Sequence, residues 1–245
     1  MTWDSNWDLS CPDWSERLVR GQSLVPFLPK LDLASGNRAV AILDKLRLHD
    51  VPGNPRLGPV LDTDPPGSLG DAGGDWFRDI VRALFGAVDP VSRARMIREV
   101  FLLVPKKNGK TTYGALLMLV ALLMNTTPGA KFIFTAPVQD TAEMALEAAS
   151  QAVEMDEVLK TKLWVRDHKN MIVHRVTKAT LEIMTFDPKV LTGQKVHGAL
   201  IDELHLCALI NGAAKAIRQL RGGMLPFPQA FMMFITTQSE EQPAG

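Results

Sequence analysis

The sequence has few cysteines and no excess of either charge. Its 245 residues include two cysteines, Cys11 and Cys207, too few and too far apart in sequence for a disulfide framework or a cysteine-based zinc site. This low cysteine usage suits a reducing cytosol. Lysine and arginine number 27, as do aspartate and glutamate, so no global field attracts nucleic acid. Any contact with DNA must therefore come from a local patch.

Long hydrophobic runs are also missing. The longest extends from Ala115 to Met124, well short of the roughly 20 residues that a membrane-spanning helix needs. Residues 1–9 include Asp4 and Asp8 and no apolar core, which is not the pattern of a signal peptide. With 46% apolar residues, the chain can still bury a full core, as one large domain or as a domain with an extension. We therefore expect no membrane partner.

The segment 99–112, EVFLLVPKKNGKTT, is an apolar run followed by a short loop and then by the apolar run 115–124. This order of strand, loop and helix is typical of a phosphate-binding P-loop. Lys110 would contact the β- and γ-phosphates of a nucleotide, and the Thr111 hydroxyl would ligate Mg²⁺. The strict motif fails, because Val104 stands where its first glycine is expected. On the loop alone, a helix N-terminus with an unrelated Gly-Lys-Thr remains the alternative.

A second motif, at residues 198–203, is an apolar run that ends in two adjacent carboxylates. A buried parallel strand delivers the residues after its carboxyl end to the ligand-binding edge of the sheet. Asp202 is thus expected in the Mg²⁺ shell, and Glu203 is expected to orient and deprotonate the attacking water. The alternative is a strand that ends in a solvated acidic turn, and the P-loop upstream argues against it.

A third apolar run, 231–235, precedes Thr236 and Thr237. It predicts another core strand, whose terminal hydroxyls can sense the γ-phosphate, although threonine is ordinary in strands. His197 and His205 flank the acidic strand without a third ligand at suitable spacing. We expect both histidines to be polar neighbours of the site and not a metal centre.

Together these motifs resemble the large terminase subunit of tailed bacteriophages, the ATPase that pumps DNA into procapsids. The resemblance rests on the loop 104–111, VPKKNGKT, the turn 191–193 that leads to the segment 201–205, IDELH, and the segment 235–237, ITT. It covers about residues 75–239 and, more loosely, the N-terminal region. The resemblance implies Mg²⁺-dependent ATP hydrolysis that translocates double-stranded DNA. It also implies a ring of subunits that works with a portal protein and a small terminase subunit, in the cytoplasm of the infected bacterial host.

The expected site residues follow from the motifs and from this resemblance. Lys110 and Glu203 are the candidate catalytic residues, and Thr111 and Asp202 are the candidate metal ligands. The ATP-binding residues are expected in the loop and at the end of the third strand: Lys106, Lys107, Asn108, Gly109, Lys110, Thr111, Thr112, Thr236 and Thr237. Two other functions stay open: another P-loop DNA translocase or helicase-like ATPase, and a non-catalytic nucleotide-binding assembly module.

Two positions depart from the family pattern. A glutamine that reads adenine commonly follows a tryptophan near the start of the domain, but here Phe77 follows Trp76. Phe77 can stack on a base, or it can be a core aromatic. Many large terminases carry an arginine before the glycine that matches Gly193, where it reaches a neighbour's ATP, but Thr192 stands there. This cation is therefore unassigned: it could be Lys195, Arg218 or Arg221, or it could come from elsewhere.

The stretch 160–178 is the most basic part of the chain, with six lysines and arginines against Asp167 alone, and with Trp164 inside it. It is the best candidate for contact with DNA phosphates. A solvated hairpin face is the alternative.

Overall, the sequence predicts an α/β chain with the three-layer P-loop NTPase fold, in which helices flank a mainly parallel central sheet. Residues 1–75 are expected to form an N-terminal arm and a connecting loop packed on the core, and residues 76–245 the P-loop ATPase domain. Since the family's nuclease domain follows its ATPase domain, the chain resembles the ATPase portion of a longer protein. Periodicity and turn residues predict helices at 37–49, 76–85, 115–124 and 141–155, further strands at 131–137 and 180–186, and loops at 51–75 and 187–195.

Overall fold

The computed structural model describes residues 11–25, 32–64, 66–89 and 91–238. They form a seven-stranded sheet with the strand order β1-β7-β6-β2-β5-β4-β3. The first five strands in this order are parallel: β1 (Glu99–Leu103), β7 (Phe231–Thr236), β6 (Gly198–Ile201), β2 (Lys131–Ala136) and β5 (Thr180–Thr185). The last two, β4 (Met171–His174) and β3 (Leu163–Arg166), form an antiparallel hairpin joined by the 3-10 turn Asp167–Lys169. The predicted mainly parallel sheet is confirmed.

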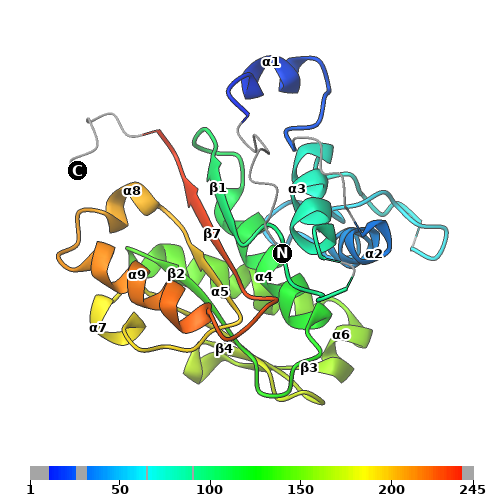
Figure 1. Ribbon diagram of the computed structural model, residues 1–245. Helices are drawn as coiled ribbons and strands as arrows, with labels where there is room; N and C mark the ends of the chain where they lie inside the picture. The colour runs from blue at the N-terminus through cyan, green and yellow to red at the C-terminus, as the bar shows by residue number, and fades with distance from the viewer. Residues whose placement is uncertain (1–10, 26–31, 65, 90, 239–245) are drawn as a thin grey trace.

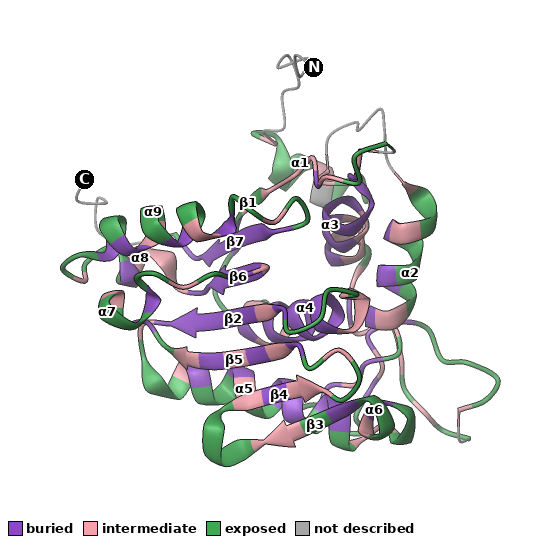
Figure 2. Cartoon of the chain, turned by 60° about the horizontal axis from the view of Figure 1, so that its bottom comes forward, coloured by how far each residue is buried: buried purple, intermediate pink, exposed green. Residues whose placement is uncertain are grey.

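Helices cover both faces of this sheet (Figures 1 and 2). On one face lie α4 (Lys110–Met124) and α5 (Gln139–Glu154), followed by α6 (Glu157–Lys162). On the other face lie α7 (Pro188–Leu191), α8 (Leu204–Cys207) and α9 (Ala213–Met224). Each face has its own cluster of buried apolar side chains. The predicted three-layer α/β architecture is therefore confirmed.

The apolar run after the P-loop becomes the central helix α4. Ten of its 15 residues are buried, because the sheet lies on one side of it and α2 (Leu33–Leu43) and α3 (Asp75–Gly86) pack on the other (Figure 1). A helix that is apolar all round is expected in such a position. Gly114 allows the close approach to the sheet, since a Cβ there would lie 3.0 Å from Ile235 and 3.1 Å from Leu200.

Most of the predicted elements are found within one or two residues of their expected bounds, and three are not. The helix expected at 115–124 is α4 and begins at Lys110, because the chain turns into the helix at Gly109. The helix expected at 37–49 is α2, which begins earlier, at Leu33, because the Asp32 side chain accepts a hydrogen bond from the Ser35 N–H and caps it. It also ends earlier, at Leu43, since Arg47 already forms a β-bridge with Arg56. The expected loop 187–195 contains α7, because Asp187 caps that short helix and Pro188 fills its first turn. Both caps were visible in the sequence as an aspartate before a helix-compatible turn.

Strand β1 lies at the edge of the sheet and pairs with β7. Phe101 is 60% exposed and Leu103 is 43% exposed, although parallel strands are normally covered on both faces. The P-loop therefore starts from a partly solvated edge strand and not from a central one.

Before α3, residues 44–74 form a loop held by charged side chains. Asp64 Oδ1 lies 2.9 Å from both Arg47 Nη2 and Arg56 Nη2, and the Asp64 side chain is 4% exposed. The N-terminal segment includes α1 (Trp14–Val19). Part of the expected N-terminal arm, residues 1–10 and 26–31, lies outside the described residues. In the part that is described, no helix is long and apolar enough to cross a membrane.

Candidate nucleotide and metal site

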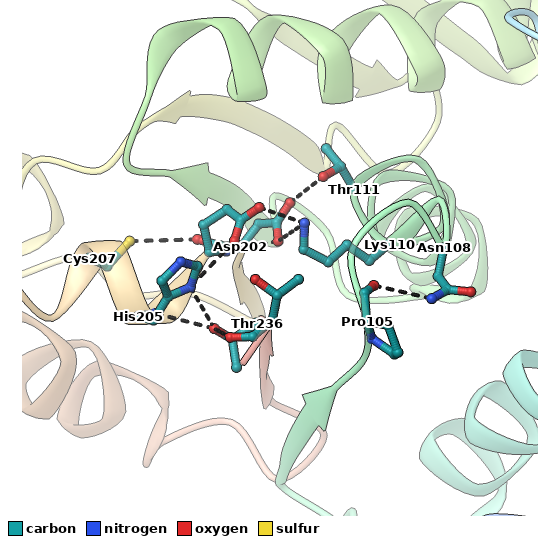
Figure 3. Close-up of polar contacts among 10 residues, drawn as sticks. Pro105, Asn108, Lys110, Thr111, Asp202, His205, Cys207 and Thr236 are labelled. Carbon is teal, nitrogen blue, oxygen red and sulfur yellow. Dashed lines mark hydrogen bonds and ion pairs between the residues drawn. The ribbon is translucent and has the colours of Figure 1, made fainter. Parts of the chain in front are cut away.

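The carboxyl ends of β1, β6 and β7 meet at one edge of the sheet, and the candidate site residues follow these three strands. The loop after β1 leads to Gly109, which has a φ of 64° and precedes the first residue of α4, Lys110. Figure 3 shows Lys110 extending from the start of α4 toward Asp202, with Thr236 at the end of β7 nearby. Glycine adopts this left-handed turn without a steric penalty, so Gly109 lets the loop turn into the helix.

The Thr111 hydroxyl donates a hydrogen bond of 2.5 Å to Asp202 Oδ2. The other oxygen, Oδ1, accepts the Glu203 backbone N–H at 2.8 Å. Asp202 is fully buried, and this burial raises the pKa of its carboxyl, although the Thr111 hydrogen bond and the Lys110 ammonium, 4.0 Å away, lower it. A hydroxyl and a carboxylate thus lie together at the start of α4.

Lys110 Nζ lies 2.5 Å from Glu203 Oε1, so the lysine of the loop and the second carboxylate of the acidic strand form an ion pair. Both side chains are mostly buried, at 12% and 20% exposure. Glu203 has a φ of 50°, a left-handed conformation that is uncommon for a residue other than glycine. Such strained residues cluster at functional sites.

Behind the two carboxylates lies α8. The His205 ring nitrogen Nδ1 lies 2.9 Å from Thr236 Oγ1 and 3.4 Å from Glu203 Oε2. Cys207 Sγ donates to the Asp202 backbone carbonyl at 3.6 Å, on the far side of that residue in Figure 3. Burial raises the pKa of the Cys207 thiol to about 12, so the thiol stays protonated and acts as a packing group.

The structure brings together Lys110, Thr111, Asp202, Glu203 and Thr236. Thr237 is buried beside them, and its carbonyl accepts the Thr236 hydroxyl at 3.3 Å. The remaining expected ATP-binding residues line the loop or the first turn of α4. Of these, Lys106, Lys107 and Asn108 are exposed, Gly109 forms the turn, and Thr112 is half-buried.

One expectation about the histidines is wrong. His205 is a neighbour of the site, but His197 precedes β6 and therefore lies at the opposite edge of the sheet, where its ring stacks on Phe227 with the centroids 3.9 Å apart. One histidine precedes β6 and the other follows it, so the two lie at opposite ends of the strand. A strand of four residues spans more than 10 Å, which separates them. Phe77 is fully buried and packs against Tyr113, with ring centroids 5.2 Å apart, so it is a core aromatic and does not face a base.

Sequence reasoning missed Tyr113. Its hydroxyl donates a hydrogen bond of 2.6 Å to the Ala72 carbonyl, and its ring lies 3.5 Å from a Cβ placed on Gly109. Tyr113 therefore joins the P-loop turn to the loop before α3. Its place directly after the Gly-Lys-Thr-Thr sequence, as the single tyrosine of the chain, was the available signal.

The candidates for an arginine that acts on a neighbour lie away from the cluster. Arg221 is bound to Glu99 at the start of β1, with Nε 2.6 Å from Oε1, and its guanidinium lies 5.5 Å from the Phe234 ring centroid. Thr192 donates to the Pro188 carbonyl at 2.7 Å and ends α7. Arg218 and Lys195 are both exposed, on the α7–α9 side of the sheet.

The basic stretch 160–178 spans the end of α6 and the hairpin of β3 and β4 at the far edge of the sheet. Lys160 pairs with Glu157 at 2.9 Å, and Arg175 donates to the carbonyls of Lys160 and Leu163. Arg166 lies over the Trp164 ring, 3.7 Å from its centroid. Much of this basic charge is thus committed to contacts within the chain.

No group of three or more His, Cys, Asp and Glu side chains that could hold a metal occurs among the residues that the structure describes.

Comparison with known proteins gives the family. The profile of the family described as "Terminase large subunit, ATPase domain" matches residues 75–244. The structure of the large terminase of bacteriophage HK97 aligns with this chain with a TM-score of 0.62 and 15% sequence identity. The alignment covers 85% of this chain and 39% of the HK97 chain. The ATPase domain of the large terminase of Thermus phage P74-26 has a TM-score of 0.46 at 16% identity, over 59% of this chain and 61% of that one.

The match to the HK97 protein shows the same fold, and this chain corresponds to about two fifths of the length of that protein. No curated protein matches the chain in sequence. Because the family profile covers more than half of the chain, the chain belongs to the family of terminase large subunit ATPase domains.

Proposed function

We propose that this chain is the ATPase motor domain of a viral DNA-packaging terminase, and that it binds and hydrolyses ATP at the cluster of Lys110, Thr111, Asp202 and Glu203. The observation that supports this most directly is the pair of 2.5 Å contacts, from Thr111 to Asp202 and from Lys110 to Glu203, at the carboxyl edge of a parallel sheet. Ligands of such sheets bind at this edge. The loop amides and the positive end of α4 favour the triphosphate there.

Each residue has a distinct role in this proposal. Lys110 binds the β- and γ-phosphates, and the loop residues Lys106, Lys107 and Asn108 surround them, with Thr112 in the first turn of α4. Thr111 and Asp202 hold Mg²⁺, for which a hydroxyl and a carboxylate are suitable hard ligands. The ion neutralises charge that develops on the transferring phosphoryl group. Thr236 and Thr237 sense the γ-phosphate from the end of β7.

Glu203 activates the attacking water in this scheme. Its carboxylate accepts a proton from water as the water attacks the γ-phosphorus, and the bond to the bridging oxygen breaks to release phosphate and ADP. In the structure Oε1 of Glu203 is bound to Lys110. The ion pair must therefore separate before Lys110 can bind phosphate and Glu203 can bind water.

The wider function follows from the family. We propose that hydrolysis translocates double-stranded DNA into a procapsid. The working motor in this proposal is a ring of such chains on a portal protein, and a small terminase subunit supplies the DNA. The motor acts in the cytoplasm of the infected bacterium. Residues 76–245 form the ATPase unit in this proposal, and residues 1–75 are an extension packed on it.

Phosphate release in the presence of ATP and Mg²⁺ tests the proposal. The wild-type chain should hydrolyse ATP, whereas Lys110→Ala should reduce activity to background. The matched control is Lys215→Ala, which removes an exposed lysine on α9 and should leave activity unchanged. Nucleotide binding without phosphate release in the wild type, with portal and DNA present, would instead support a non-catalytic assembly module.

A further inference from the structure

The two carboxylate oxygens of Glu203 have different surroundings. Oε1 accepts the Lys110 ammonium, whereas Oε2 is inaccessible to solvent and has no hydrogen-bond partner among the described residues. A buried carboxylate oxygen without a partner is unfavourable, because it has lost its hydration without gaining a hydrogen bond. His205 Nδ1 lies 3.4 Å from this oxygen, close enough for an ion pair but beyond a well-formed hydrogen bond.

The contacts of Thr236 indicate which His205 nitrogen carries a proton. The Thr236 hydroxyl donates its one proton to the Thr237 carbonyl at 3.3 Å, so its oxygen is left to accept. It accepts the His205 backbone N–H at 3.3 Å and faces His205 Nδ1 at 2.9 Å. The direction of the 2.9 Å contact depends on the histidine tautomer, and we assign the proton to Nδ1. The Nδ1–H then has two acceptors within reach: Thr236 Oγ1 and Glu203 Oε2.

From this geometry we propose that His205 is a positioning residue for Glu203. It holds the Glu203 carboxylate through Nδ1–H when Lys110 moves to phosphate, while its backbone N–H stays bound to Thr236 Oγ1 at the end of β7. This inference rests on the proposed role of Glu203 in ATP hydrolysis.

The reason lies in the exchange of partners. Lys110 cannot bind Glu203 and phosphate at full strength together, so Oε1 loses its cation as the nucleotide binds. Glu203 would then be a carboxylate that is 20% exposed and whose second oxygen is also unpaired. Turning the Nδ1–H of His205 from Thr236 to Oε2 supplies a partner without moving α8. It fixes one oxygen of the carboxylate and leaves the other for water.

A purely structural role for His205 predicts something different. If the ring served only to pack α8 against β7, its removal would lower stability and weaken nucleotide binding, with no selective effect on turnover. A positioning role predicts a loss in kcat at nearly unchanged ATP affinity, because misplacing a catalytic group by about 1 Å can reduce the rate roughly 100-fold.

Three substitutions at His205 separate these possibilities. His205→Asn places an amide near the position of Nδ1, His205→Gln places it near Nε2, and His205→Ala removes both. We expect Ala and Gln to lower kcat roughly 10- to 100-fold with KM changed less than about threefold, and Asn to restore most of the lost rate. Binding of a fluorescent ATP analogue and the thermal midpoint should stay close to wild type in all three.

The inference is overturned if His205→Ala keeps the wild-type kcat, if Asn and Gln are equally impaired, or if the loss appears in nucleotide binding and stability instead of kcat. The proposed function fails in a different way, namely if the wild-type chain itself releases no phosphate or if Glu203→Gln hydrolyses ATP normally. Measuring wild type and Glu203→Gln beside the His205 variants therefore tells the two failures apart.

Discussion

Lys110 Nζ and Glu203 Oε1 lie 2.5 Å apart, although 93 residues separate them in sequence. The pair joins the P-loop to the acidic strand and neutralises two side chains that are mostly buried. Breaking such a pair from one side leaves a poorly solvated charge, whereas removing both charges avoids it. The stability of the site and its proposed activity therefore depend on the same two groups.

Lys110→Ala should remove ATP binding and also destabilise the fold, by about 1–3 kcal/mol, because Glu203 loses its cation. The double variant Lys110→Ala/Glu203→Gln should recover most of that stability while remaining inactive. Thermal or denaturant unfolding of the four chains of this cycle measures the coupling. If the double variant is as unstable as the sum of the single variants, the ion pair does not contribute to the fold in solution.

Glu203→Gln should bind ATP with Mg²⁺ but turn it over roughly 10²- to 10⁴-fold more slowly, because the amide cannot accept the proton of the attacking water. Single-turnover phosphate release together with analogue binding separates the two effects. Normal hydrolysis by this variant would assign water activation to another residue. The matched comparison is Glu182→Gln, which changes a half-buried carboxylate on β5 that pairs with Lys131 at 2.7 Å, away from the site.

Asp202 gives a prediction about pH. Burial raises the pKa of its carboxyl above that of the unfolded chain, so the folded protein holds this proton to a higher pH. At a pH between the pKa of Asp202 in the unfolded chain and its higher pKa in the folded chain, folding takes up a proton. The contribution of Asp202 to the free energy of unfolding therefore falls as the pH rises from the first value to the second. Above it, the ionised buried carboxylate opposes folding.

Asp202→Asn should therefore raise the thermal midpoint at pH 7 while weakening the proposed Mg²⁺ site. The amide keeps the shape, accepts the Glu203 N–H through its oxygen and donates to the Thr111 hydroxyl through its nitrogen. Melting curves of wild type and variant from pH 4 to pH 8 give the measurement, with the difference in midpoint widening as the pH rises. A variant that is less stable than wild type at pH 7 would show that the Asp202 charge is favourable in the fold.

The sequence predicted the cluster because its residues lie directly after apolar strands, and parallel strands bring such residues to one edge. Asp202, Glu203 and Thr236 followed from this rule alone. It could not give the ion pair between Lys110 and Glu203 or the place of His205, since these depend on side-chain rotamers and on the left-handed turn at Glu203. His197 shows the limit of the rule, because proximity to a strand in sequence does not say which end of the strand a residue occupies.

The last prediction concerns a cation supplied by a neighbouring chain. An arginine contributed in trans typically raises phosphoryl-transfer rates by about 10³ to 10⁵, so isolated chains without one should hydrolyse ATP slowly. Arg221 is held by Glu99 at the start of β1, about 13 Å from the end where the P-loop begins, so it does not act on its own site. Arg218 is exposed one turn earlier on α9, and no ion pair of its guanidinium is found in the described part of the chain. Of the two, Arg218 is the better candidate for the cation that acts on a neighbour. If the site is completed by a neighbouring chain, ATPase activity should rise more than linearly with protein concentration, or rise on docking to portal and DNA.

Mixing variants tests this assignment. Arg218→Ala and Glu203→Gln should each be nearly inactive alone, but a mixture should recover activity, because the Glu203→Gln chain still offers Arg218 to a neighbour whose Glu203 is intact. Arg221→Ala should keep most of the wild-type activity, since it removes only an exposed ion pair worth about 1 kcal/mol or less, and it is the matched control on the same helix. Recovery with Arg221→Ala instead of Arg218→Ala would exchange the two roles. Full activity in a dilute, monomeric sample would mean that each chain completes its own site, and that no arginine from a neighbour is needed.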